Sequence, residues 1–175
     1  MGNVSTSALP AGPRGRGAAG KALVRIAAPV DGGKVGRIRL ARVAEASAAA
    51  LLPATTAAVS PGRQVLTDGW SGYAPLQAKG YRHAVVRHHA VVGANLLPRA
   101  NRVAALLQRW LLATHQGAVA AAHLDYYLDE FTFRFNRRNS RSRGLLFQRL
   151  VEQALALAPV RGAELVGGKH PKSWR

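Results

Sequence analysis

A short apolar run that ends in an acid and a glycine is the feature that most constrains the fold. In QVLTDGWSGY, residues 64–73, Val65 and Leu66 lead to Asp68, and Gly69 follows. Apolar residues bounded by turn residues predict a buried strand that ends at Asp68. An acid in that place can hold a metal ion or an attacking water at a sheet edge. An Asp-Gly pair is also ordinary turn chemistry, so this stretch alone favours a capping role for Asp68.

Length and cysteine content exclude several classes of protein. The chain has 175 residues, enough for one domain with a buried core, and it contains no cysteine. Disulfides, thiolate metal sites and cysteine nucleophiles are therefore excluded. No apolar stretch approaches the ~18 residues that a membrane span requires. The first residues contain Pro, Gly and Arg where a signal peptide would carry an apolar segment, so we expect a cytoplasmic protein.

The charge balance indicates a polyanionic partner. Lys and Arg total 25 against 8 Asp and Glu, which gives a net charge of +17. Such an excess is typical of proteins that bind nucleic acid, and most of these cations are arginine, whose planar group suits phosphate. A GC-rich genome also enriches arginine. An anionic membrane is the rival partner, but no basic amphipathic segment with an exposed apolar face is visible, so we expect no membrane binding.

The first half of the chain alternates strand and helix patterns. Residues 1–21 mix Ser, Gly, Pro, Ala and Arg without periodicity, which predicts a disordered basic segment. Two strands joined by a tight turn follow, then an alanine-rich helix interrupted at Pro53, the strand that ends at Asp68, a short helix and a further strand. Besides the Asp68 strand, the expected ranges are 22–30, 36–44, 45–59, 73–79 and 81–88.

Helical periodicity dominates the second half. Leu124, Leu128, Phe131 and Phe135 follow one another at offsets of four, three and four, which places them on one face of a helix over residues 121–138. Strands followed by helices, with helices between the later strands, indicate a mixed α/β domain. Further helices are expected at 99–115 and 142–158, and a flexible basic tail at 161–175.

The segments TDGWSGY, GYRH, RWLLATHQG and YLDEFTFRFNRR together resemble the DDE-type transposases of bacterial insertion sequences. The resemblance is to insertion-sequence family fifteen-ninety-five, the ISXO-like transposase domain, over residues 36–158, and it is most specific over 109–144. It implies an RNase H-like mixed sheet with flanking helices and a helical C-terminal half. This incomplete domain would span residues 22–160, with its first core strand missing. The implied cofactor is Mg²⁺ or Mn²⁺, and the implied partner is duplex DNA at insertion-sequence ends; a homo-oligomer stays open.

The resemblance also implies a set of catalytic and metal-binding residues. In the family, acids hold two divalent metals that drive an in-line phosphoryl displacement. Asp68 matches the second acid, and Asn101 matches the third position, which the family fills with Asn, His or Glu. A local hydrogen bond at a helix start explains Asn101 equally well. Gln108 stands where the family has a lysine, so its neighbour Arg109 is expected to supply the cation that contacts DNA.

The first acid of the family has no counterpart. The resemblance places it on a strand before residues 22–30, and residues 1–30 contain neither Asp nor Glu. Asp31 falls in the predicted turn and Glu45 begins a predicted helix, so neither fits the position. We therefore expect a truncated copy that begins just after its first catalytic acid.

A cluster of arginines between aromatic residues suits phosphate contact better than the alternative, a solvated helix end. Glu130 beside it is either a partner for an arginine or a catalytic acid. The histidines have no third ligand at a plausible spacing and are expected to be incidental. The cluster consists of Arg134, Arg137, Arg138, Arg141 and Arg143.

Three functions are compatible with these features. One is a DDE transposase that cuts and joins DNA ends, and the second is a non-catalytic DNA-binding protein derived from one. The third is a basic RNA- or ribosome-associated module, which the matches around Asp68 and over 109–144 argue against. We expect the ancestry of the first with an activity closer to the second.

Overall fold

A computed structural model describes residues 2–6, 22–86, 97–116 and 119–166. The chain divides into two compact units, Met1–Ala118 and Val119–Arg175, and each is considered by itself. The predicted domain of residues 22–160 spans both units. No helix in the described ranges is both long and apolar enough to cross a membrane.

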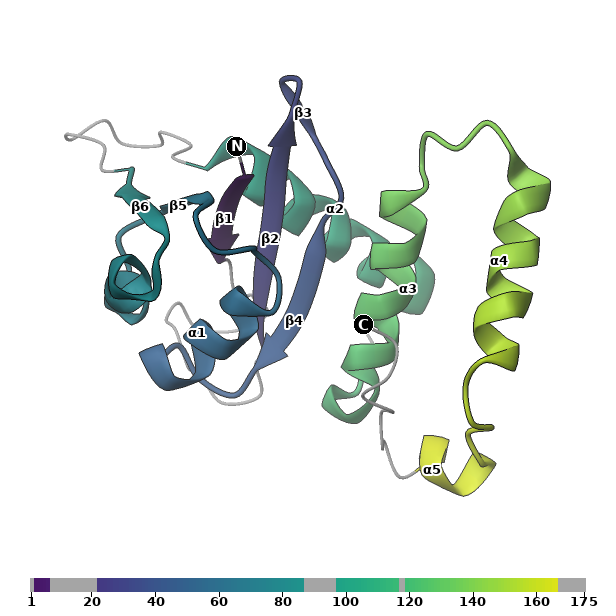
Figure 1. Ribbon diagram of the computed structural model, residues 1–175. Helices are drawn as coiled ribbons and strands as arrows, with labels where there is room; N and C mark the ends of the chain where they lie inside the picture. Colours follow the sequence, from purple (N-terminus) through teal and green to yellow (C-terminus); the bar gives the residue numbers. More distant parts are fainter. Residues whose placement is uncertain (1, 7–21, 87–96, 117–118, 167–175) are drawn as a thin grey trace. The chain divides into compact units, whose positions relative to one another are not determined.

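The first unit contains six strands, two α-helices and one 3-10 helix among its described residues (Figure 1). In chain order they are β1 (Gly2–Thr6), β2 (Leu23–Asp31), β3 (Lys34–Val35), β4 (Arg39–Val43), α1 (Ala48–Thr56), β5 (Gln64–Thr67), η1 (Ser71–Lys79), β6 (Arg82–Val85) and α2 (Pro98–His115).

β2 is the central strand of this unit. It pairs antiparallel with β1 along one edge and with β4 along the other, so that Arg25 lies opposite both Thr6 and Ala41. β5 and β6 pair in parallel, and β5 lies beside β1. Residues 24–28 of β2 are all buried, as expected for a strand covered on both faces. The strands therefore form a four-stranded sheet, in which β2 lies between β1 on one edge and β3 and β4 on the other, and a two-stranded sheet of β5 and β6 beside β1.

β1 differs from two sequence-based predictions. Residues 2–6 form a strand, although disorder was expected over residues 1–21 and the first core strand was expected to be missing. The segment GNVST has no apolar periodicity, and its order comes from backbone pairing with β2, which a local pattern does not reveal. Residues 7–21 of the predicted segment lie outside the described ranges.

The turn between β2 and β3 agrees with its prediction. Asp31 pairs with Lys34 across a two-residue turn formed by Gly32 and Gly33. The φ angles of these glycines are 50° and 82°, the left-handed values that a tight hairpin of this type requires. β3 begins directly after the turn, and the chain then continues into β4.

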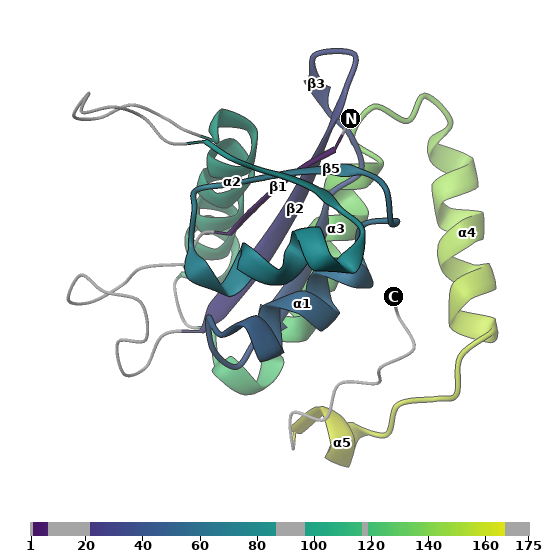
Figure 2. The same cartoon turned by 60° about the vertical axis from the view of Figure 1, so that its left-hand side comes forward.

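The helices of the first unit cover both faces of the sheet. Figure 2 shows α2 on one side and α1 on the other, where η1 contacts α1. Leu51, Val65 and Tyr73 are fully buried between α1, β5 and η1. α1 continues through Pro53, where an interruption was predicted; Pro53 is exposed, so the carbonyl that loses its hydrogen bond can face water.

The described part of the second unit is helical. It contains η2 (Ala121–His123), α3 (Leu124–Asn136), α4 (Arg143–Leu155) and α5 (Gly162–Val166). Leu124, Leu128 and Phe131 of α3 are buried, as the apolar pattern predicted. α4 buries no residue, and Phe147 is 72% exposed despite its place in an apolar pattern. α5 occupies the start of the predicted flexible tail; residues 167–175 lie outside the described ranges.

Candidate functional site

Asp68 lies directly after β5 in a turn that local hydrogen bonds define. The backbone N–H of Trp70 donates to Asp68 Oδ1 at 3.3 Å, and the N–H of Gly69 donates to Thr67 Oγ1 at 3.3 Å. Gly69 has a φ of 87°, which glycine adopts without strain. The half-buried carboxylate thus makes the turn-capping bond that an Asp-Gly pair favours.

His83 contacts the residue that precedes this turn, Thr67. Thr67 is fully buried, and its Oγ1 lies 2.9 Å from His83 Nε2 on β6. The Thr67 hydroxyl has one proton and two acceptor lone pairs, so it can accept from Gly69 and also bond to a neutral His83, in a direction set by the tautomer of the ring. Burial lowers the pKa of His83, which favours that neutral form. Sequence reasoning gave His83 no role, although GYRH carries part of the family resemblance.

A buried arginine is the second feature that sequence reasoning missed. Arg25 in β2 is 2% exposed, and Tyr73 of η1 is fully buried. Burial raises the pKa of the Tyr73 hydroxyl, while the charge of Arg25 lowers it and the charge of Asp68 raises it. Both charges therefore act on the same hydroxyl. The sequence feature that could have indicated this buried arginine is its place inside the apolar run LVRIAAPV.

The other predicted ligand, Asn101, lies in the first turn of α2. It is exposed, and its backbone N–H donates to the carbonyl of Leu97 at 3.0 Å, the first helical hydrogen bond. Gln108 is half-buried two turns further along, and Arg109 beside it is exposed. The structure thus places Asp68 and Asn101 in the same unit, one after a strand and one at a helix start.

The described residues do not fit a two-metal centre. No cluster of three His, Asp or Glu side chains capable of holding a metal occurs among them. β1 is the strand that precedes β2, and its sequence GNVST contains no carboxylate. A two-metal site draws most of its negative charge from protein carboxylates, and here only Asp68 matches one.

Three of the clustered arginines are held by neighbours on α3. Arg134 forms an ion pair with Glu130 at 2.7 Å, the partner role that was one alternative for this acid. The guanidinium groups of Arg137 and Arg138 stack over the rings of Phe133 and Phe135, at 3.7 Å and 4.1 Å from the ring centres.

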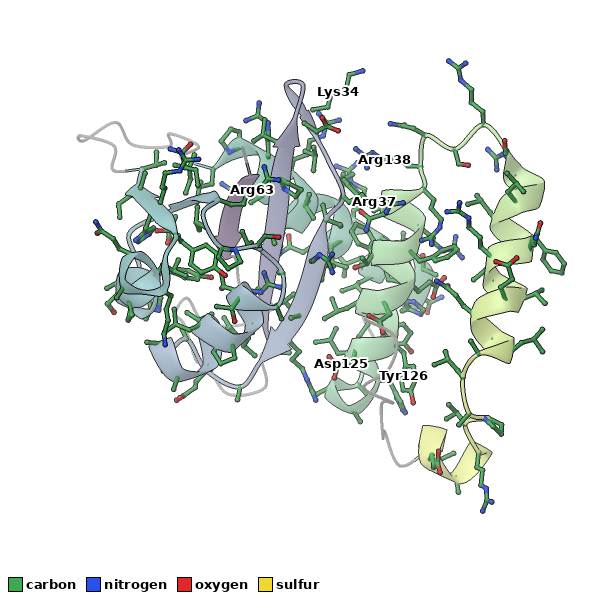
Figure 3. All side chains as sticks on the ribbon, viewed as in Figure 1. Lys34, Arg37, Arg63, Asp125, Tyr126 and Arg138 are labelled. Atoms are coloured by element: carbon green, nitrogen blue, oxygen red, sulfur yellow. The ribbon has the colours of Figure 1, made fainter. Side chains whose placement is uncertain are left out.

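The remaining two arginines, Arg141 and Arg143, follow α3 and are exposed. Arg138 also donates to the carbonyl of Phe135 at 2.8 Å, and Figure 3 shows it at the end of α3. Stacking orients a guanidinium, and the exposed Arg138 keeps N–H groups accessible to an anion, whereas Arg137 is half-buried and its Nε is shielded from solvent. The segment from the end of α3 to the start of α4 thus presents stacked and exposed cations together.

Comparison with known protein families places the chain among the transposases. Residues 2–136 match the model of the ISXO2-like transposase domain, and the chain belongs to this family. None of the curated proteins compared with it matches.

The solved structures include a similar fold in the cryoEM structure of the simian T-cell lymphotropic virus intasome in complex with PP2A regulatory subunit B56 gamma. The sequence identity is 15% and the TM-score 0.49. The similarity covers 81% of this chain and 50% of the other.

Proposed function

We propose that this transposase domain binds duplex DNA at insertion-sequence ends and does not itself cut it. The observation that carries the binding proposal is the arginine cluster at the end of α3, where Phe133 and Phe135 orient two guanidinium groups. Oriented arginines lose less conformational freedom when they meet a phosphate. Phosphate contacts of this kind bind DNA without reading its sequence.

The salt dependence of DNA binding tests this surface. Replacing Arg137, Arg138 and Arg141 by alanine should reduce the slope of log affinity against log salt by up to about 2.7, at about 0.9 for each phosphate contact. Fluorescence anisotropy with a short labelled duplex measures the slope.

A charge-matched control is the triple variant of three exposed cations of the first unit, Arg63, Lys79 and Arg82. Its slope should stay near that of the unchanged chain. An unaltered slope in the variant of the α3 cluster would refute the assignment of that cluster.

The proposed lack of cleavage rests on the carboxylates. In-line displacement with two metals needs enough negative oxygen to hold both ions roughly 3.5–4 Å apart. β1 offers none, Asn101 is neutral, and Asp68 already accepts a backbone hydrogen bond. Asp68 alone would hold magnesium weakly, through retained waters. A non-catalytic DNA-binding role is therefore the better supported of the two transposase-derived functions.

Purified chain should neither nick nor join a labelled terminal-repeat substrate with magnesium or manganese. A family member with all three acids, assayed on its own ends, is the positive control. Metal-dependent nicking that disappears in Asp68→Ala would overturn the proposal, because it would show that another group completes the site.

A further inference from the structure

Four exposed cations lie on the segment that runs from the start of β3 into β4. They are defined here as the edge stripe: Lys34, Arg37, Arg39 and Arg42. No Asp or Glu occurs from residue 32 to residue 44. Figure 3 shows Lys34 projecting from the tip of the hairpin, with Arg37 further down the same hairpin. The stripe lies in the first unit and includes none of the arginines assigned above.

Hydrogen bonds to β2 and α2 hold the segment that contains the edge stripe. β4 pairs with β2 along one edge, and no second partner strand occurs among the residues that the structure describes. The N–H of Gly36 donates to the carbonyl of Pro29 at 2.9 Å, which fixes the path between β3 and β4. Arg99 of α2 donates to the carbonyl of Gly33 at 3.2 Å and ties the hairpin tip to the helix.

Protection of an open sheet edge accounts for only part of the stripe, because Arg37 lies outside β4. Edge strands commonly carry a charged residue, most often lysine, that deters pairing with another chain. Here three of four cations are arginines. Within the described ranges, Arg37 and Arg39 form neither a hydrogen bond nor an ion pair through their side chains. The solvated guanidinium groups of Arg37 and Arg39 are therefore suited to phosphate.

We propose that the edge stripe is a second contact surface for duplex DNA. The inference rests on the proposed function, since it takes the same ligand class. At roughly 3.3 Å per residue, Arg39 and Arg42 are about 10 Å apart along β4, and because they are three residues apart their side chains lie on opposite faces of the strand, on either side of the edge away from β2. DNA carries one phosphate per roughly 3.4 Å of helix axis on each strand, and successive phosphates lie further apart than this because the strand winds round the axis, so the stripe can meet a few of them. Contacts of this kind position the duplex and do not select its sequence.

The slope of affinity against salt again provides the test. Replacing Arg37, Arg39 and Arg42 by alanine should lower its magnitude by up to about 2.7. Replacing the same residues by lysine keeps the charge and should largely preserve the slope. The Arg63, Lys79 and Arg82 variant removes equal charge from another part of the same unit and should leave it unchanged.

A second measurement uses the unchanged chain and does not depend on whether the variants fold. Lys34 and Lys79 are both exposed, and both react with an amine-directed reagent. Bound duplex should protect Lys34 and leave Lys79 reactive, as read by mass spectrometry of peptides.

The outcomes separate the two proposals. If the unchanged chain fails to bind duplex, both fall together. If it binds, and both the edge variant and the reactivity of Lys34 are unaffected, the edge stripe is refuted while the α3 cluster stands. An equal loss in the control triple would also refute the stripe, since total charge rather than position would then govern binding.

Discussion

At the scale of single residues, the informative side chains are the buried polar ones. The pair formed by Thr67 and His83 joins positions 16 residues apart, and Arg25 lies inside an apolar strand. Local patterns predicted Asp68 at a strand end and its turn-capping bond correctly. They could not predict which residue of β6 would meet Thr67, because the register of a parallel pair depends on contacts distant in sequence.

His83 should make stability depend on pH. Burial lowers its pKa below the usual 6.5, so the unfolded chain takes up a proton more readily than the folded one. The free energy of unfolding should therefore rise with pH between the lowered pKa and the usual value. The stabilisation is lost as the pH falls through that window.

Urea unfolding of the unchanged chain and of His83→Gln, from about pH 5 to about pH 8, measures this dependence. Glutamine keeps a hydrogen-bonding group near Thr67 but does not titrate, so the rise should be smaller in the variant. Since the other histidines are common to both proteins, the difference isolates His83. Parallel profiles would show that His83 titrates alike in the folded and unfolded chains.

At the scale of elements, β2, β5 and the helices match their predicted ranges about equally well, whereas the strand β1 was missed. α2 and α3 match their expected ranges within a few residues because an apolar stripe repeats over several turns. β1 is only five residues long and carries no such pattern. α4 shows the limit of periodicity: its apolar residues follow a helical repeat, yet the structure buries none of them.

Two leucines of α2 provide a matched test of its buried face. Leu107 is fully buried and Leu112 is 64% exposed. Leu107→Ala should lower the free energy of unfolding by about 2–5 kcal/mol, because it removes buried methyl groups and leaves a cavity. Leu112→Ala should change it by less than about 0.5 kcal/mol. Chemical denaturation measures both values, and equal effects would mean that the buried face is misassigned.

At the scale of the whole molecule, the sequence predicted a mixed α/β chain with a helical second half, and both features are observed. Family membership followed from a few motifs, which the match over residues 2–136 confirms. The division near residue 118 was not predicted, since the apolar patterns run similarly on both sides of it. The pairing of β1 was also missed, because β1 has no apolar pattern of its own and its partner β2 lies further along the sequence.

The place of β1 has a consequence for how the protein acquires its structure. One of its edges pairs with β2, and it also lies beside β5, which is synthesised only after β2, β3, β4 and α1. Closing a contact over such a length of chain costs entropy before any pairing compensates for it. Folding dominated by distant contacts is slow. During synthesis on the ribosome, the edge of β1 that faces β5 therefore stays uncovered until β5 has been made, and an uncovered strand edge can associate with other chains.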